Sequence, residues 1–136
     1  MMRIYYKGGS KYHLVQKYNI LLDFRPPHPI GTWFIHLSNS GLLEIKAGYP
    51  WDGPSGPTFD TKSFMRASLV HDALYELMRQ GLLDIEFREA ADRELRRICR
   101  EDGMSRIRAW YVYRSVRLFA GGSASTSNRK EVIEAP

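Results

Sequence analysis

Two aspartates, a histidine and a tyrosine stand at spacings that could activate a water molecule. The stretch SLVHDALYELMRQG, residues 68–81, places His71 beside Asp72, with Tyr75 one helical turn further on. Asp92 follows His71 after 21 residues (92 − 71). A carboxylate that accepts a hydrogen bond from one imidazole nitrogen fixes the ring tautomer and leaves the other nitrogen free to take a proton. The pattern predicts His71 as a general base, with Asp92 and Tyr75 as its catalytic partners.

Two antiparallel helices must carry these residues. From about residue 61 the apolar period is helical, with one face made of Phe64, Ala67, His71, Leu74, Tyr75 and Met78. A second helix is predicted over residues 85–102, with a stripe of Phe87, Ala91, Leu95 and Ile98. Gly81 suits the end of the first helix, and the short connection there makes the two helices neighbours. A turn near residues 81–82 would place His71 opposite Asp92.

Asp72 points about 100° away from His71 on a helix, so the two cannot serve the same partner. The segment before the helix, GYPWDGPSGP at residues 48–57, holds three prolines and three glycines and predicts an ordered turn series or a ligand loop. Asp72, Asp52 and carbonyl oxygens around Gly53 are the candidate cation ligands, and Ca²⁺ accepts such oxygens. A hard metal beside a His–Asp pair can support the hydrolysis of esters. The other candidate loop residues are Trp51, Pro54, Ser55 and Gly56.

The first half of the chain predicts antiparallel β structure. Strands are expected over residues 12–24, 30–37 and 42–47, and SNSG at 38–41 predicts a hairpin turn. A third helix is predicted over residues 105–119, with Ile107, Trp110, Tyr111 and Leu118 facing inward. The expected fold is α+β, with N-terminal antiparallel β hairpins packed beside a C-terminal three-helix half.

The length of 136 residues and a hydrophobic content of 43% predict one domain with a sizeable core. We expect this domain to span residues 1–120, β-rich over 1–50, with a loop at 48–60 and helices over 61–119. The Gly/Ser-rich segment 121–136 is expected to be a flexible tail.

The cysteine and hydropathy patterns predict a compartment. Cys99 is the only cysteine, so no intrachain disulfide can form, and the N-terminus MMRIYYKGGS lacks the apolar core of a signal peptide. No run reaches the roughly 18 apolar residues of a membrane span. These features predict a cytoplasmic protein without a transmembrane segment.

The net charge of +5 is unevenly distributed, because residues 88–117 hold nine Arg against five Asp or Glu. Such an excess could face the phosphates of nucleic acid or of lipid head groups, or could be a solvated pair of helix faces. No recognised nucleic-acid-binding motif accompanies the arginines, so nucleic acid ranks last among the expected partners.

Four motifs in order resemble a known family. Four segments, AGYPWDGPSGP, SLVHDALYELM, REAADRELRRI and RAWYVYRSVRLFAGG, are similar to the phage- and prophage-borne family called domain of unknown function 1353, and the match covers about residues 45–121. The resemblance implies a tailed phage or a prophage as the source and implies no activity. The expected location is then the cytoplasm of the phage host, with virion association left open.

The helix pair also resembles that of the small calcium-dependent phospholipases of the A-two class, especially the prokaryotic ones. That resemblance implies that His71 is the general base, Asp72 the calcium carboxylate, Tyr75 and Asp92 the orienting partners, and the segment around Asp52 the calcium loop. The chain departs from these enzymes in three respects: it cannot form a disulfide, its loop is proline-rich, and it has an N-terminal β half.

Two functions of different classes follow from these expectations. The first is a metal-dependent hydrolase of lipid esters or of related esters or amides of the host envelope. The second is a non-catalytic phage protein that binds a host or virion partner and uses the His–Asp–Tyr network only to fasten its core. Cation binding that requires Asp72 would favour the first function.

Overall fold

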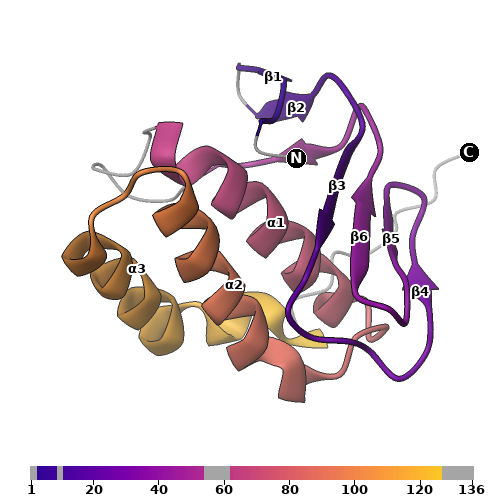
Figure 1. Ribbon diagram of the computed structural model, residues 1–136. Coiled ribbons are helices and arrows are strands. Elements are labelled where there is room, and N and C mark those ends of the chain that lie inside the picture. Colours follow the sequence, from indigo (N-terminus) through magenta and orange to yellow (C-terminus); the bar gives the residue numbers. More distant parts are fainter. Residues whose placement is uncertain (1–2, 9–10, 54–61, 127–136) are drawn as a thin grey trace, which may run out of the picture.

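The chain folds into two small antiparallel sheets and three α-helices, an α+β arrangement, in a computed structural model that describes residues 3–8, 11–53 and 62–126 (Figure 1). One sheet has the order β1-β2-β7 and is made of β1 (Tyr6–Lys7), β2 (Tyr12–Leu14) and β7 (Pro50–Trp51). The other has the order β3-β6-β5-β4 and is made of β3 (Tyr18–Leu21), β4 (Ile30–Gly31), β5 (Ile35–Leu37) and β6 (Leu42–Ile45). The predicted fold class is confirmed.

The predicted hairpin turn is present, but two predicted strands are wrong in their length. β5 and β6 pair across residues 38–41, where Gly41 has φ +92° and lies against the carbonyl oxygen of Phe24. Residues 12–24 form two strands in different sheets, because the chain leaves β2 at Leu14 and enters β3 only at Tyr18. Residues 30–37 turn back on themselves, and Thr32 N–H donates to Ile35 O at 2.7 Å.

The helices follow the predicted apolar periods. They are α1 (Lys62–Arg79), α2 (Arg88–Glu101), which is preceded by the short 3₁₀ helix η1 (Ile85–Phe87), and α3 (Arg106–Phe119). Gly81, with φ +73°, ends α1, and Leu82 N–H donates to Leu77 O at 3.0 Å, as in glycine-terminated helices. Ser105 begins α3 by accepting from Arg108 N–H at 3.2 Å.

The predicted inward face of α3 is wrong. Ile107, Trp110, Tyr111 and Leu118 are exposed, and the buried residues of the helix are Ala109 and Val112. The prediction placed these side chains in the core because they are large and apolar, but α3 contacts α2 through its smaller residues. The helix therefore turns its bulky apolar side chains outward.

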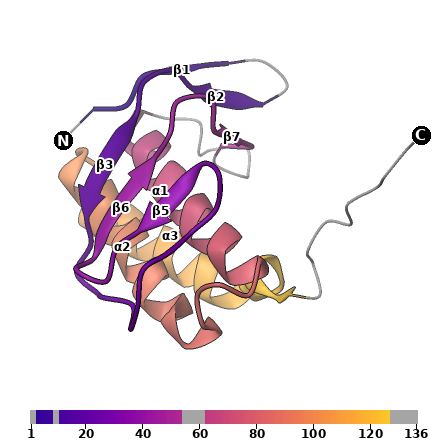
Figure 2. The same cartoon turned by 90° about the vertical axis from the view of Figure 1, so that its right-hand side faces the viewer.

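The helices form a layer against one face of the four-stranded sheet. Figures 1 and 2 show β3, β6 and β5 on one side of this layer and α3 on the side away from the sheet. One hydrophobic core joins the sheet to α1 and α2, and its largest fully buried side chains include Trp51, Tyr18, Leu43, Leu74 and Leu95. α1 thus lies between the sheet and α2, and its His71 face meets α2.

The first residues of the predicted tail are structured. Gly121–Ala124 forms the 3₁₀ helix η2, Ala124 is buried, and Arg79 donates to Ser123 O at 2.8 Å. The segment that was expected to be a flexible tail thus begins with a short helix packed against the fold, and residues 127–136 lie outside the described ranges. Among the helices of the described residues, none is long and apolar enough to cross a membrane.

Candidate functional site

His71 and Asp92 face each other across the α1–α2 contact, as their 21-residue separation predicts. The two side chains join through His71 Nε2 and Asp92 Oδ1 at 2.6 Å. No described residue forms a hydrogen bond with the other ring nitrogen, Nδ1. The imidazole lies on the ring of Tyr75, with centroids 4.1 Å apart, and its side chain is 13% exposed. His71 is thus held on one side and accessible on the other.

Asp92 is fully buried, yet three donors surround its carboxylate. Besides His71, the Tyr75 hydroxyl donates to Oδ1 at 2.7 Å and Arg117 Nη1 donates to Oδ2 at 2.8 Å. Burial raises the pKa of Asp92, but the hydrogen bonds from His71, Tyr75 and Arg117 outweigh it, so the pKa lies below its ordinary value. Asp92 is therefore ionised at neutral pH and favours the His71 tautomer that carries its proton on Nε2.

Tyr75 has a second partner that ties the site to α3. Arg88 Nε donates to the Tyr75 hydroxyl oxygen at 3.1 Å, and Arg88 Nη2 donates to Val116 O and Arg117 O at 2.8 and 2.9 Å. These carbonyls lie in the last turn of α3, where a cation is favoured, and Val116 O also accepts from Ala120 N–H at 3.0 Å. Burial and the charge of Asp92 raise the pKa of Tyr75, so its hydroxyl remains a donor.

Asp72 points away from Asp92, and its partner is an aromatic hydroxyl. Tyr49 donates to Asp72 Oδ2 at 2.7 Å. Burial raises the pKa of Asp72, and the Tyr49 hydrogen bond and the charge of Arg79 act in the opposite direction without cancelling it. The carboxylate that the sequence assigns to a cation is therefore engaged with Tyr49.

The segment before α1 lies beside these residues as far as it is described. Trp51 is buried, and its Nε1 donates to Ser68 Oγ at 3.1 Å. Asp52 is exposed and forms an ion pair with Lys11 at 3.6 Å. Gly53 has φ +79°, and a Cβ there would clash with the ring of Tyr12, so only glycine fits this turn. Pro54, Ser55 and Gly56 lie outside the described residues.

A cleft of about 620 Å³ opens between this segment, α1 and the end of α3. His71, Asp72 and Tyr75 line it together with Asp52 and Gly53, so the structure brings the predicted residues to one place. Asp92 lies behind them, under His71. Much of the remaining lining is apolar or aromatic: Phe34, Tyr49, Trp51, Phe64, Leu95, Val116 and Ala120. The volume lies within the range of small-molecule sites.

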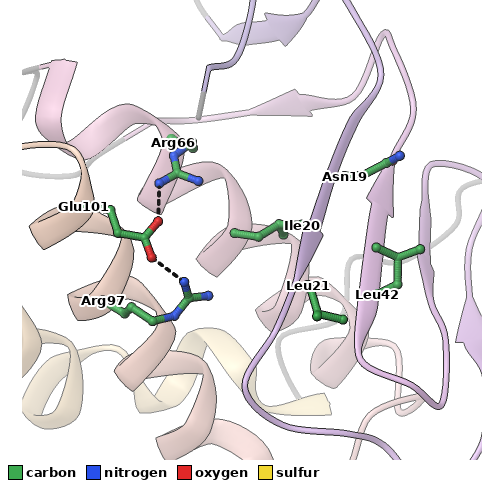
Figure 3. A pocket seen from close by; sticks show the side chains of 7 residues that line it. All are labelled: Asn19, Ile20, Leu21, Leu42, Arg66, Arg97 and Glu101. Carbon is green, nitrogen blue, oxygen red and sulfur yellow. Dashed lines mark hydrogen bonds and ion pairs between the residues drawn. The ribbon is translucent and has the colours of Figure 1, made fainter. Parts of the chain in front are cut away.

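A second hollow of about 410 Å³ lies between β3 and the helices. Figure 3 shows Glu101 between Arg66 and Arg97, which it binds at 2.9 and 2.6 Å. Arg66 also binds Asp102 and the Tyr18 hydroxyl. The charges in this hollow are satisfied by one another, so we assign the candidate site to the larger cleft.

Sequence reasoning missed Tyr49, Arg88 and Arg117. Tyr49 belongs to the Gly/Pro segment but was not singled out, and the two arginines were counted only as part of a basic run. The signal for Arg88 and Arg117 was present in their positions at the start of one predicted helix and the end of the next, which antiparallel packing brings together. Their side chains become part of the site because the end of α3 lies beside Arg88 and Asp92 of α2.

The calcium site implied by the phospholipase resemblance requires several oxygen ligands. Within the parts of the chain that are described, no group of three His, Cys, Asp or Glu residues could hold a metal ion. Asp72 bonds with Tyr49, and Asp52 pairs with Lys11.

A family model described as "Protein of unknown function (DUF1353)" matches residues 33–116, more than half of the chain. The matched range includes β5, β6, α1, α2 and most of α3, and hence every residue of the His71–Asp92 network except Arg117. No curated protein and no solved structure matches the chain.

Proposed function

The chain belongs to the DUF1353 family of proteins of unknown function, and we propose that it is a hydrolase in which His71, oriented by Asp92, activates water to attack a carboxylic ester. One observation carries this proposal: the imidazole is fixed through Nε2, while Nδ1 has no described partner and His71 lines the cleft. A histidine that served only to fasten the core would gain stability from using both nitrogens.

The proposed reaction follows from the tautomer that Asp92 selects. As the water oxygen forms its bond to the ester carbonyl carbon, one water proton passes to His71 Nδ1. The resulting imidazolium is stabilised by the ionised Asp92, and it later returns the proton to the departing alcohol oxygen. The products are a carboxylic acid and an alcohol, and His71 ends neutral.

The lining of the cleft indicates the class of ester. Aromatic and aliphatic side chains from β7, α1 and α3 form much of the wall, and Trp51 has its polar atom bound to Ser68. Such a wall gains free energy from contact with an apolar acyl or alkyl group. We therefore expect medium-chain and lipid esters to be better substrates than acetate esters.

The second candidate function is the non-catalytic one, in which the chain binds a host or virion protein. Its support is that Asp92 joins α1, α2 and α3 and has both oxygens satisfied, as a structural fastener would. In this alternative, the accessible nitrogen of His71 has no role.

The test is a hydrolysis assay with p-nitrophenyl esters of two to twelve carbons, followed by phospholipid vesicles. His71→Gln is expected to lower kcat by about 10²–10⁴-fold, the range for loss of a general base. His36→Gln is the matched control, because His36 is an exposed histidine on β5 that does not line the cleft.

A second matched pair separates chemistry from stability. Tyr75→Phe and Tyr18→Phe each remove one tyrosine hydroxyl that hydrogen-bonds a charged side chain, the first at Asp92 and the second at Arg66. Only Tyr75→Phe should lower kcat, although both should lower the melting temperature. Absence of turnover by the wild type, or full activity in folded His71→Gln, would favour the non-catalytic function.

A further inference from the structure

The outward surface of α3 is an apolar stripe exposed to solvent. Ile107, Tyr111 and Leu118 are 81%, 63% and 65% exposed, and Trp110 is 49% exposed. Their spacing of three, four or seven residues places them with Arg114 on one side of the helix. We call these five residues the α3 outer face.

The charge of α3 is of one sign. The helix, RIRAWYVYRSVRLF, contains four arginines and no acidic residue. Arg114 is exposed within the α3 outer face, and Arg106 is exposed at the beginning of the helix. A helix with exposed aliphatic and aromatic side chains among arginines differs from an ordinary solvated surface, which would carry charges of both signs.

We propose that the α3 outer face binds a lipid surface that carries negative charge. Ile107 and Leu118 can enter the boundary between head groups and acyl chains, where burial of apolar area is favourable. Trp110 and Tyr111 suit the same boundary, since each ring has an apolar body and a polar atom. The arginines can extend toward lipid phosphates while their methylene groups remain among the apolar side chains.

Two other occupants fit the observations less well. A second copy of the chain would bring the same face to its partner in a symmetric contact, and the arginines would then oppose arginines. Nucleic acid would satisfy the arginines and could stack on Trp110, but it would leave Ile107 and Leu118 in contact with phosphates and sugars. An anionic bilayer satisfies both the charge and the aliphatic side chains.

This surface adjoins the proposed active site without depending on it. Leu118 and Phe119 lie in the last turn of α3, between Val116 and Ala120, which line the cleft. A bilayer bound at the α3 outer face would therefore lie near the cleft lining. Membrane binding rests on α3 alone, so it can hold even if the proposed hydrolase activity does not.

The experiment is sedimentation of the full chain with vesicles of phosphatidylcholine alone or with 30% phosphatidylglycerol. We expect binding to the anionic vesicles only, weakened by salt. The double variant Ile107→Gln/Leu118→Gln should reduce the partitioning of the protein onto anionic vesicles by about tenfold or more. The double variant Arg106→Gln/Arg114→Gln should reduce it by about fivefold for each arginine removed. Lys7→Gln with Lys17→Gln is the matched charge control and should bind as the wild type does.

Fluorescence places the contact on the helix. In a Trp33→Phe background the remaining tryptophans are Trp51, which is buried, and Trp110. A blue shift on addition of anionic vesicles would then report Trp110.

His71→Gln should keep full vesicle binding, which separates this inference from catalysis. The inference is overturned if folded wild type does not sediment with anionic vesicles, or if the Ile107/Leu118 variant binds them unchanged. The inference is also overturned if the Ile107/Leu118 variant loses self-association or nucleic-acid binding in place of vesicle binding.

Discussion

Arg117 at the end of α3 binds Asp92 Oδ2, the carboxylate oxygen that His71 and Tyr75 leave free. The contact is 2.8 Å long, and Asp92 is fully buried while the Arg117 side chain is 27% exposed. Asp92 therefore holds three helices through one carboxylate. Because the same group orients His71, the position of α3 is coupled to the geometry of the candidate site.

Removal of this contact should destabilise the fold. Arg117→Met leaves a buried carboxylate with one fewer charged donor, so we expect the free energy of unfolding to fall by about 1–3 kcal/mol. Arg93→Met is the matched control, since it breaks an exposed ion pair with Glu89 and should cost at most about 1 kcal/mol. Urea denaturation of both variants measures the difference, and equal losses would contradict the importance of the Arg117 contact.

Acid should weaken the fold through Asp92. Its pKa in the folded chain lies below the ordinary value of about 3.9. Its contribution to stability is therefore complete above that ordinary value and is lost as the pH falls through the folded pKa. Asp92→Asn should be less stable than the wild type at pH 7, and the gap should narrow below about pH 4. Melting temperatures from pH 2.5 to 7 test this, and a gap that is constant over that range would count against it.

The sequence predicted the contact between His71 and Asp92 better than it predicted the sheets. The His71–Asp92 pairing depends on two helical periods and on one glycine-terminated turn. Both are local properties, and they can be read from Gly81 and from the residue spacing. The division of residues 12–24 between two sheets depends on which strands lie opposite, such as β7 beside β2, and no local pattern carries that information. The roles assigned to the site residues, and the phage source, remain predictions.

The orientation of α3 could not be predicted for a similar reason. Its period was correctly recognised, but two faces of the helix carry apolar residues, one small and one large. Packing against α2 selects the face of Ala109 and Val112, because small side chains let the two helices approach closely. A prediction of burial from residue size alone therefore selects the wrong face of this helix.

Neutralisation of Asp72 should stabilise the protein at neutral pH. Burial holds the pKa of Asp72 above its ordinary value, so its contribution to stability is present below that value and is lost as the pH rises through the folded pKa. Asp72→Asn keeps an oxygen that can accept from Tyr49 and should raise the free energy of unfolding at pH 7. The gain should vanish below about pH 4. Asp52→Asn, at an exposed carboxylate, is the control and should leave stability unchanged at both pH values.

Calcium should not stabilise the chain, although the phospholipase resemblance implies it. Ca²⁺ takes six to eight oxygen ligands in proteins, whereas the described part of the cleft offers Asp72, which already accepts from Tyr49, and Asp52, which pairs with Lys11. We expect the melting temperature of the metal-stripped protein to be unchanged by millimolar calcium. Calorimetric titration with Asp72→Asn as the control gives the sharper result. Calcium binding that disappears in this variant would contradict the expectation and would show that a calcium site is completed around Asp72.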